Sequence, residues 1–138
     1  MNEPERKLSA GVVVLVGIAY FVVGFDFAAL ANPSDQVRMW RLAAWVASTA
    51  VFAAHIVYEH FRLGNPPRAT ALRAAVAVAA GAFLLAAAAT VHASVAVSHA
   101  PYWRFLLALV VWPVITALPA FLVALVAGAA LARLSRRT

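Results

Sequence analysis

Four long stretches of this sequence contain no Lys, Arg, Asp or Glu, and they constrain the fold more than any other feature. They run over residues 8–25, 42–58, 74–103 and 105–132 of the 138-residue chain. About 20 apolar residues in a helix span the hydrocarbon core of a bilayer, which is about 30 Å thick. A backbone within that core must satisfy its own polar groups, which favours α-helices. We therefore predict an all-α, polytopic membrane protein.

The composition agrees with this prediction. The chain is 65% hydrophobic and 12% charged, whereas soluble domains are about 25% charged. A chain this short has too few polar groups to cover a soluble fold, so its apolar surface must face lipid. We expect residues 1–138 to form a single transmembrane domain with no soluble domain. Its helices should cover about 10–31, 40–62, 70–96 and 102–133 in an up-down-up-down bundle.

Turn signals separate the expected helices. They are Asn32-Pro33-Ser34, Gly64-Asn65-Pro66-Pro67 and His99-Ala100-Pro101. Proline removes a backbone donor and restricts the residue before it, so regular helices end near these positions.

The basic residues predict the orientation of the bundle. Three belong to one side: Arg38, Arg41 and Arg104. Eight belong to the other: Arg6, Lys7, Arg62, Arg68, Arg73, Arg133, Arg136 and Arg137. Cytoplasmic loops are the richer in Lys and Arg, so we expect both termini in the cytoplasm and the protein in a plasma membrane of the bacterial inner type. Trp40, Tyr102 and Trp103 would then lie at the outer interface.

The first segment also resembles a signal peptide. Arg6 and Lys7 precede an apolar run, and Ala29-Leu30-Ala31 resembles a cleavage site. The run is longer than the usual 7–15 residues, and Asp26 interrupts its end. We therefore expect the first helix to be retained. Cleavage before Asn32 would leave three helices.

Polar residues on the second helix recur on one face. Arg41, Ser48, His55 and Arg62 are spaced by seven, and Glu59 lies four residues after His55. Ionisable groups are costly in lipid and usually face the interior of a bundle. This face should therefore point towards the other helices.

An inner polar cluster is expected near the cytoplasmic ends of the helices. It comprises His55, Glu59, His60, Arg62 and Arg73. In one interpretation it is a proton-handling or ligand-binding site, because a nearby carboxylate can bring the pKa of a histidine into the physiological range. In the other it is structural: Glu59 pairs with Arg62 or Arg73, and His60 faces the headgroups.

An outer polar cluster is expected at the other side, from Asp26, Arg41, His92 and Arg104. Antiparallel neighbouring helices would hold these residues at similar depth. In the structural interpretation Asp26 pairs with Arg41 or Arg104. In the functional interpretation Asp26 and His92 form an outward-facing cation or proton site.

Two prolines interrupt the fourth helix. Pro113 and Pro119 leave the carbonyls of Leu109 and Ile115 without helical donors and favour kinks. Thr116 could satisfy one of those carbonyls. The bend would be either a gating or ligand-lining element, or a tolerated irregularity in a helix with length to spare.

Small residues predict where helices approach closely. Gly17 and Gly24 lie on nearly one face of the first helix, and Gly81 and the run Ala86–Ala89 lie on the third. Small side chains allow helix backbones to pack tightly in lipid.

No cofactor or metal is expected. The chain has no cysteine, which excludes thiol chemistry and Cys-ligated metals. His55 and His92 should differ in depth by about 10–15 Å, too far to ligate one iron within a protomer. A haem shared between protomers stays open. Gly-rich phosphate loops, hydrolase motifs and nucleic-acid-binding modules are also missing, so we expect no nucleic-acid partner despite the net charge of +6.

Three functional hypotheses remain. The first is a non-enzymatic membrane protein that acts by helix–helix assembly, as a subunit, regulator or homo-oligomer in the lipid bilayer. The second is a small proton-coupled or cation transporter or channel that uses Asp26, His55, Glu59 and His92. The third is a histidine-dependent redox or lipid-acting membrane enzyme. The missing catalytic motifs and the small-residue faces favour the first hypothesis.

Overall fold

Four α-helices make up almost all of the protein in a computed structural model that describes residues 3–31, 35–95 and 102–135. They are α1 (Glu3–Ala31), α2 (Val37–Phe61), α3 (Pro67–Val95) and α4 (Tyr102–Leu134). Each is long and apolar enough to cross a membrane. The predicted all-α fold with four transmembrane helices is confirmed. The predicted turns at 32–34 and 99–101, together with residue 96, Arg136 and Arg137, lie outside the described residues.

The helix bounds differ from the predicted ones mainly at the starts. α1 begins at Glu3 instead of about residue 10, because a helix can continue beyond the hydrocarbon core without apolar residues. α3 begins at Pro67 instead of about residue 70. The carbonyl of Pro66 accepts bonds from the backbone N–H groups of Ala69 (2.9 Å) and Thr70 (3.1 Å). Proline suits the first helical position because its missing N–H would have no partner there.

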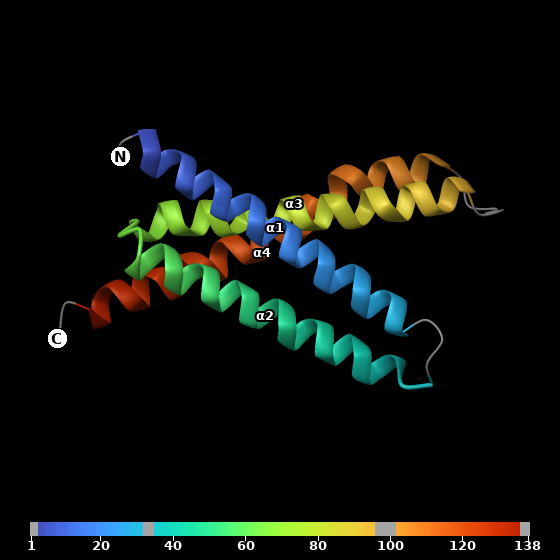
Figure 1. Ribbon diagram of the computed structural model, residues 1–138, viewed down its shortest axis with the longest axis horizontal. Helices are drawn as coiled ribbons and strands as arrows, with labels where there is room; N and C mark the ends of the chain where they lie inside the picture. The colour runs from blue at the N-terminus through green and yellow to red at the C-terminus, as the bar shows by residue number, and fades with distance from the viewer. Residues whose placement is uncertain (1–2, 32–34, 96–101, 136–138) are drawn as a thin grey trace.

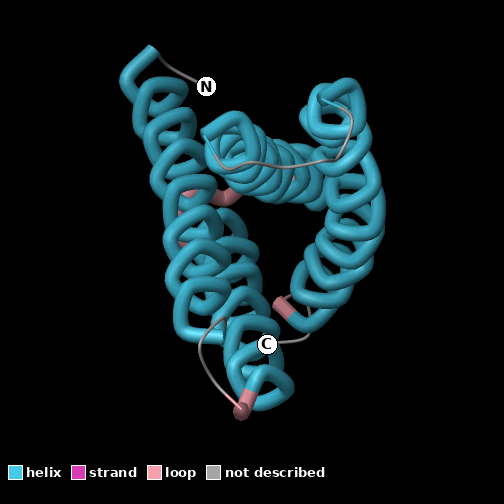
Figure 2. Tube along the Cα trace, turned by 90° about the vertical axis from the view of Figure 1, so that its right-hand side faces the viewer, coloured by secondary structure: helices cyan, strands magenta, loops and turns pink. Residues whose placement is uncertain are grey.

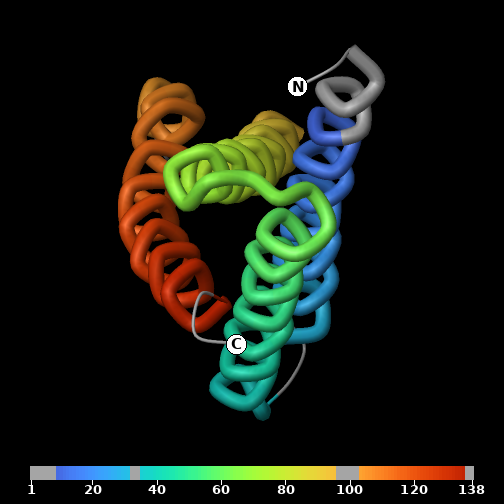
Figure 3. Tube along the Cα trace, turned by 90° about the vertical axis from the view of Figure 1, so that its left-hand side faces the viewer, coloured from blue at the N-terminus to red at the C-terminus, as the bar shows by residue number. Residues whose placement is uncertain are grey.

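The helices form two antiparallel hairpins that cross each other (Figure 1). Both termini and the turn between α2 and α3 lie at one end of the bundle, and the hairpins diverge towards the other end. α3 lies between α1 and α4 in both end views (Figures 2 and 3). α3 contacts each of the other helices, whereas α1 and α4 do not contact each other in the described part of the chain. α3 is therefore the central helix.

α1 and α3 cross where two glycines meet. A Cβ atom added to Gly81 would lie 2.5 Å from the Cβ of Tyr20 and 2.9 Å from the carbonyl oxygen of Gly17. A Cβ on Gly17 would lie 3.1 Å from the Cβ of Ala80. Gly24 packs against Leu85 further along the same pair. The predicted close approach of small residues is confirmed at this crossing.

A small apolar core joins α2, α3 and α4 at the end that holds the termini. Its buried members are Ile56, Ala71, Ala74 and Ala124. Nearby, Gly128 of α4 meets the backbone of α3, since a Cβ there would lie 3.3 Å from the Cα of Pro67. Alanine and glycine therefore bring three helices together at the same end as the predicted inner polar cluster.

α4 runs as one helix through Pro113 and Pro119 and is visibly curved (Figure 3). The hydroxyl of Thr116 donates to the carbonyl of Trp112 at 2.9 Å and lies 3.1 Å from that of Pro113. The prediction that Thr116 satisfies Leu109 or Ile115 is therefore wrong. A threonine hydroxyl on a helix reaches back only three or four residues, so neither carbonyl is within its reach.

Candidate functional site

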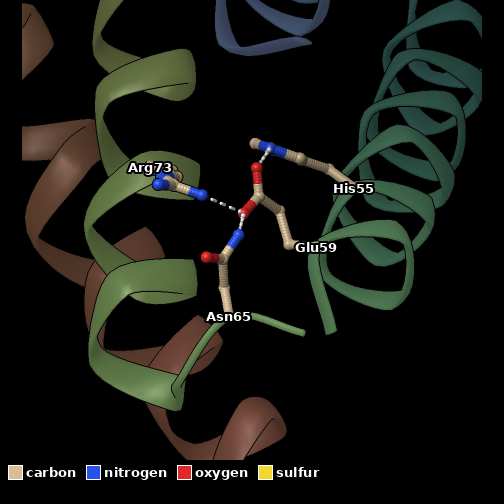
Figure 4. A network of polar contacts seen from close by, with 4 residues as sticks. All are labelled: His55, Glu59, Asn65 and Arg73. Carbon is tan, nitrogen blue, oxygen red and sulfur yellow. Dashed lines mark hydrogen bonds and ion pairs between the residues drawn. The ribbon is translucent and has the colours of Figure 1, made fainter. Parts of the chain in front are cut away.

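Glu59 lies at the centre of the most deeply buried cluster of polar side chains among the described residues. Its side chain is 0% exposed and lies between α2 and α3. Oε2 accepts a hydrogen bond from Nδ2 of Asn65 at 2.6 Å and another from Nη1 of Arg73 at 2.9 Å (Figure 4). Arg73 is therefore the ion-pair partner of Glu59, whereas the sequence was compatible with either Arg62 or Arg73. Arg62 is exposed and lies at the end of α2.

The turn after α2 positions Asn65 for this contact. Gly64 has a φ of +59°, a left-handed conformation that glycine adopts without the strain of a Cβ atom. The chain then doubles back, and the backbone N–H of Asn65 donates to the carbonyl of Glu59 at 3.2 Å. Asn65 thus caps the last turn of α2 with its backbone and binds the Glu59 carboxylate with its side chain.

Asn65 was not predicted as a partner of Glu59, because Gly64-Asn65-Pro66-Pro67 was interpreted only as a turn. The available signal was an amide side chain directly after a glycine that ends a helix, six residues from a carboxylate that needs donors.

His55 completes the cluster one turn before Glu59. Its side chain is fully buried, and its Nε2 lies 3.6 Å from Oε1 of Glu59, which is longer than a hydrogen bond. Neither ring nitrogen of His55 has a hydrogen-bond partner in the described structure, and neither does Oε1 of Glu59. The imidazole faces the carboxylate (Figure 4). Three of the four polar side-chain atoms of this pair therefore have no hydrogen-bond partner in the described structure.

The arrangement is well suited to joining helices. A buried charge is costly unless it is paired and hydrogen-bonded, and one oxygen of Glu59 meets both conditions through Asn65 and Arg73. The Arg73 side chain is 19% exposed, so its guanidinium lies at the border of the cluster. We name Glu59, Asn65, Arg73 and His55 the inner network.

His60 lies outside the inner network. It is half-buried, and its Nε2 is 3.4 Å from the hydroxyl of Ser135 at the end of α4. Its ring also packs edge-on against Phe61. This residue joins the ends of α2 and α4.

The outer residues do not form a cluster within one protomer. Asp26, Arg41, His92 and Arg104 are all exposed, and no ion pair joins any two of them among the described residues. The expected pairing of Asp26 with Arg41 or Arg104 is not made within the described part of one protomer. Asp26 is two residues from Gly24, or about 200° around α1, so it points away from the face that packs on the other helices. Arg104 is on α4, which does not contact α1.

No arrangement of metal ligands is evident in the described ranges. They contain no group of three or more His, Cys, Asp or Glu side chains that could hold an ion. His55 is near the carboxyl end of α2 and His92 near that of α3, and these ends lie at opposite ends of the bundle (Figure 1). The two histidines therefore cannot ligate one iron within a protomer.

Comparison with known proteins assigns no relatives. No protein-family model matches the chain, and no curated protein or solved structure matches it significantly.

Proposed function

We propose that this protein acts by helix–helix assembly in the membrane, as a homo-oligomer that serves as a structural or regulatory subunit. The carrying observation is Asp26, an exposed carboxylate on the outward face of α1 with no ion-pair partner in the described part of its own chain. Acids inside transmembrane segments are costly and pair with other groups. A partner from outside the protomer would supply that pair.

The depth of Asp26 supports this argument. The apolar span Ser9–Ala31 has 23 residues and is about 35 Å long at the helical rise of 1.5 Å per residue. If the span is centred on a core of about 30 Å, Asp26 lies about 5 Å inside the hydrocarbon boundary. An aspartate side chain is short, so headgroup water is harder to reach from there than it is for the longer Lys or Arg.

Arg104 is the cation that we propose for the contact with a second copy. It is exposed at the start of α4, with its guanidinium 5.7 Å from the ring centre of Trp103. α1 and α4 lie on opposite sides of α3 (Figure 2). A contact between Asp26 of one copy and Arg104 of the next would therefore be head-to-tail, which generates a ring when the rotation closes.

The proposal also includes the orientation of the protein in the membrane. Both termini and the α2–α3 turn share one end of the bundle (Figure 1), and eight of the eleven basic residues belong to that end by sequence. Such an excess is typical of the cytoplasmic side. A parallel ring with cytoplasmic termini in a plasma membrane of the bacterial inner type fits this distribution.

Charge exchange tests the assembly. Blue-native electrophoresis and in-membrane crosslinking should show an oligomer for the native chain and a shift towards monomer for Asp26→Arg and for Arg104→Asp. The double variant should recover the oligomer, since it restores the pair in reverse. Asp35→Asn, an exposed acid before α2, is the control and should assemble normally. A native chain that is monomeric in membranes, or a double variant no better than either single one, would reject the proposal.

Proton-coupled transport is the second candidate, favoured by the unfilled hydrogen-bonding capacity of His55 beside Glu59. Chains of histidine and carboxylate side chains form the proton relays of membrane pumps and transporters, and the imidazole of His55 lies 3.6 Å from the Glu59 carboxylate. Proteoliposome flux of protons or small cations, compared among the native chain, Glu59→Gln and His55→Gln, tests this candidate. Flux in the native chain that both variants abolish would support it, and no flux above that of empty liposomes would remove it.

A further inference from the structure

A groove lies between α1 and α2 at the end of the bundle where the two helices are joined. It has a volume of about 540 Å³ and is lined by α1 residues Gly24, Phe27, Ala28 and Ala31 and by α2 residues Val37, Trp40, Arg41, Ala44 and Trp45. Ligand sites in proteins typically measure about 300–1,000 Å³ and are mostly apolar with a few placed polar groups. The groove fits that description.

Aromatic rings form much of its wall. Phe27 and Trp40 contact each other across the two helices, with ring centres 6.1 Å apart. Trp45, one turn further into the membrane, is 75% exposed. These rings provide an apolar surface that a hydrocarbon chain can cover, with Ala28 and Ala44 leaving room between the helices.

Among the described residues that line the groove, Arg41 is the only charged one. Asp26 lies on the opposite face of α1, and no acidic side chain is among the lining residues. Arg38 adds a second exposed cation one turn before Arg41, outside the lining. The charge of the groove therefore complements an anion.

The depth of Arg41 suits a lipid headgroup. It lies four residues into α2, or about 6 Å from the start of the helix. Long arginine side chains at such positions reach the membrane interface while their stems cover apolar surface. A guanidinium there can hold a phosphate through paired, charge-assisted hydrogen bonds.

We propose that this groove binds one anionic phospholipid, with its phosphate on Arg41 and an acyl chain lying over Trp40, Ala44 and Trp45. Charge complementarity favours a lipid over a helix from a second copy, because the lining is cationic and its only other surface is apolar. The site does not depend on the proposed assembly, which uses the opposite face of α1 and α4.

Native mass spectrometry of the full chain tests the site, with phosphatidylglycerol and phosphatidylcholine of identical acyl chains as probes. Both lipids carry a phosphate, but the choline cation of phosphatidylcholine cancels its charge and is repelled by the guanidinium, so the native protein should retain phosphatidylglycerol about tenfold more tightly. Arg41→Gln should remove most of that preference. Arg38→Gln is the matched control, since it removes the same charge outside the lining, and it should keep the preference.

Filling the groove with a larger side chain distinguishes binding in the groove from general attraction of lipids to the surface of the protein. Ala28→Phe should fill the groove and weaken the binding of both lipids, whereas Ala29→Phe, one residue on and outside the lining, should not. Circular dichroism of each variant establishes that the helices are retained. Equal retention of the two lipids by the native chain would overturn the proposal. An equal loss of the preference for phosphatidylglycerol in Arg41→Gln and Arg38→Gln would also overturn it. Disulfide-linked dimers of Ala44→Cys, in a chain with no other cysteine, would show that a second copy fills the groove and would also overturn it.

Discussion

Nη1 of Arg73 lies 2.9 Å from Oε2 of Glu59, and this contact fastens α3 to α2 where the two helices leave their shared turn. The Glu59 side chain is fully buried and the Arg73 side chain is mostly buried. Removing one member of such a pair leaves an uncompensated charge in a low-dielectric setting, which is why buried pairs are sensitive to single substitutions.

Arg73→Ala should therefore destabilise the protein by about 3–5 kcal/mol, the usual cost of breaking a buried pair. The measurement is unfolding in detergent, followed by circular dichroism. Arg68→Ala removes the same charge from an exposed position five residues earlier and should change stability by less than about 0.5 kcal/mol. If both variants unfold alike, the contact of Arg73 with Glu59 is not what holds the helices.

A double substitution refines this prediction. Glu59→Gln combined with Arg73→Leu removes both charges, and it should recover much of the stability lost in Arg73→Ala because no charge stays buried without a partner. A double variant as unstable as Arg73→Ala would mean that packing, not charge, sets the loss.

Gly64 is required by its backbone conformation, not by space. A Cβ there would meet nothing within 4 Å, but φ is +59°. Gly64→Ala should cost about 1–2 kcal/mol, and Gly64→Asn should cost less because asparagine visits this conformation more readily. Denaturant titration of the three proteins in one detergent measures the order. Equal stability of the alanine and asparagine variants would contradict the backbone explanation.

Gly81 is required by space. Gly81→Ala places a Cβ 2.5 Å from that of Tyr20 and 2.9 Å from a backbone oxygen of Gly17, so α1 must move away from α3. We expect a loss of about 1–3 kcal/mol from overpacking. Gly11→Ala, where nothing lies within 4 Å, is the same substitution at an open helical site and should be neutral or stabilising by up to about 1 kcal/mol. Thermal unfolding compares the two, and a Gly81→Ala variant as stable as Gly11→Ala would remove the steric argument.

The proposed orientation predicts which of two introduced cysteines is labelled in intact cells. Single cysteines can be introduced at Asp35, beside the α1–α2 turn, and at Ser135, after α4; both positions are exposed. A membrane-impermeant maleimide should label Asp35→Cys in intact cells and Ser135→Cys only after the cells are broken. The reverse pattern would place the termini outside.

Depth along each helix could be predicted from the sequence, because charge spacing and helical rise determine it. This is why the four helices, the buried face of His55 and Glu59, and a pairing of Glu59 with either Arg62 or Arg73 could be predicted, while the choice of Arg73 came from the structure. The direction in which a side chain points also depends on which helices are neighbours. Asp26 was expected to pair with Arg41 or Arg104 at a similar depth, but its face of α1 turns outward.

The role of Asn65 could not be predicted from the sequence for a different reason. Its side chain reaches Glu59 only because Gly64 adopts a left-handed conformation and reverses the chain. A pattern of turn-forming residues indicates that the chain bends, but the bend direction decides which side chains meet. Gly17 and Gly81 were easier to interpret, since small residues in a lipid-spanning helix have few other uses.

The central position of α3 has a consequence for biosynthesis. α1 and α2 leave the ribosome first, but the residues that complete their contacts, Gly81 for Gly17 and Arg73 for Glu59, both belong to α3. Arg73 follows Glu59 by only 14 positions, so the cation is synthesised shortly after the acid. We expect α2 and α3 to enter the bilayer together as a hairpin, with α1 held beside the insertion machinery until α3 arrives to receive it.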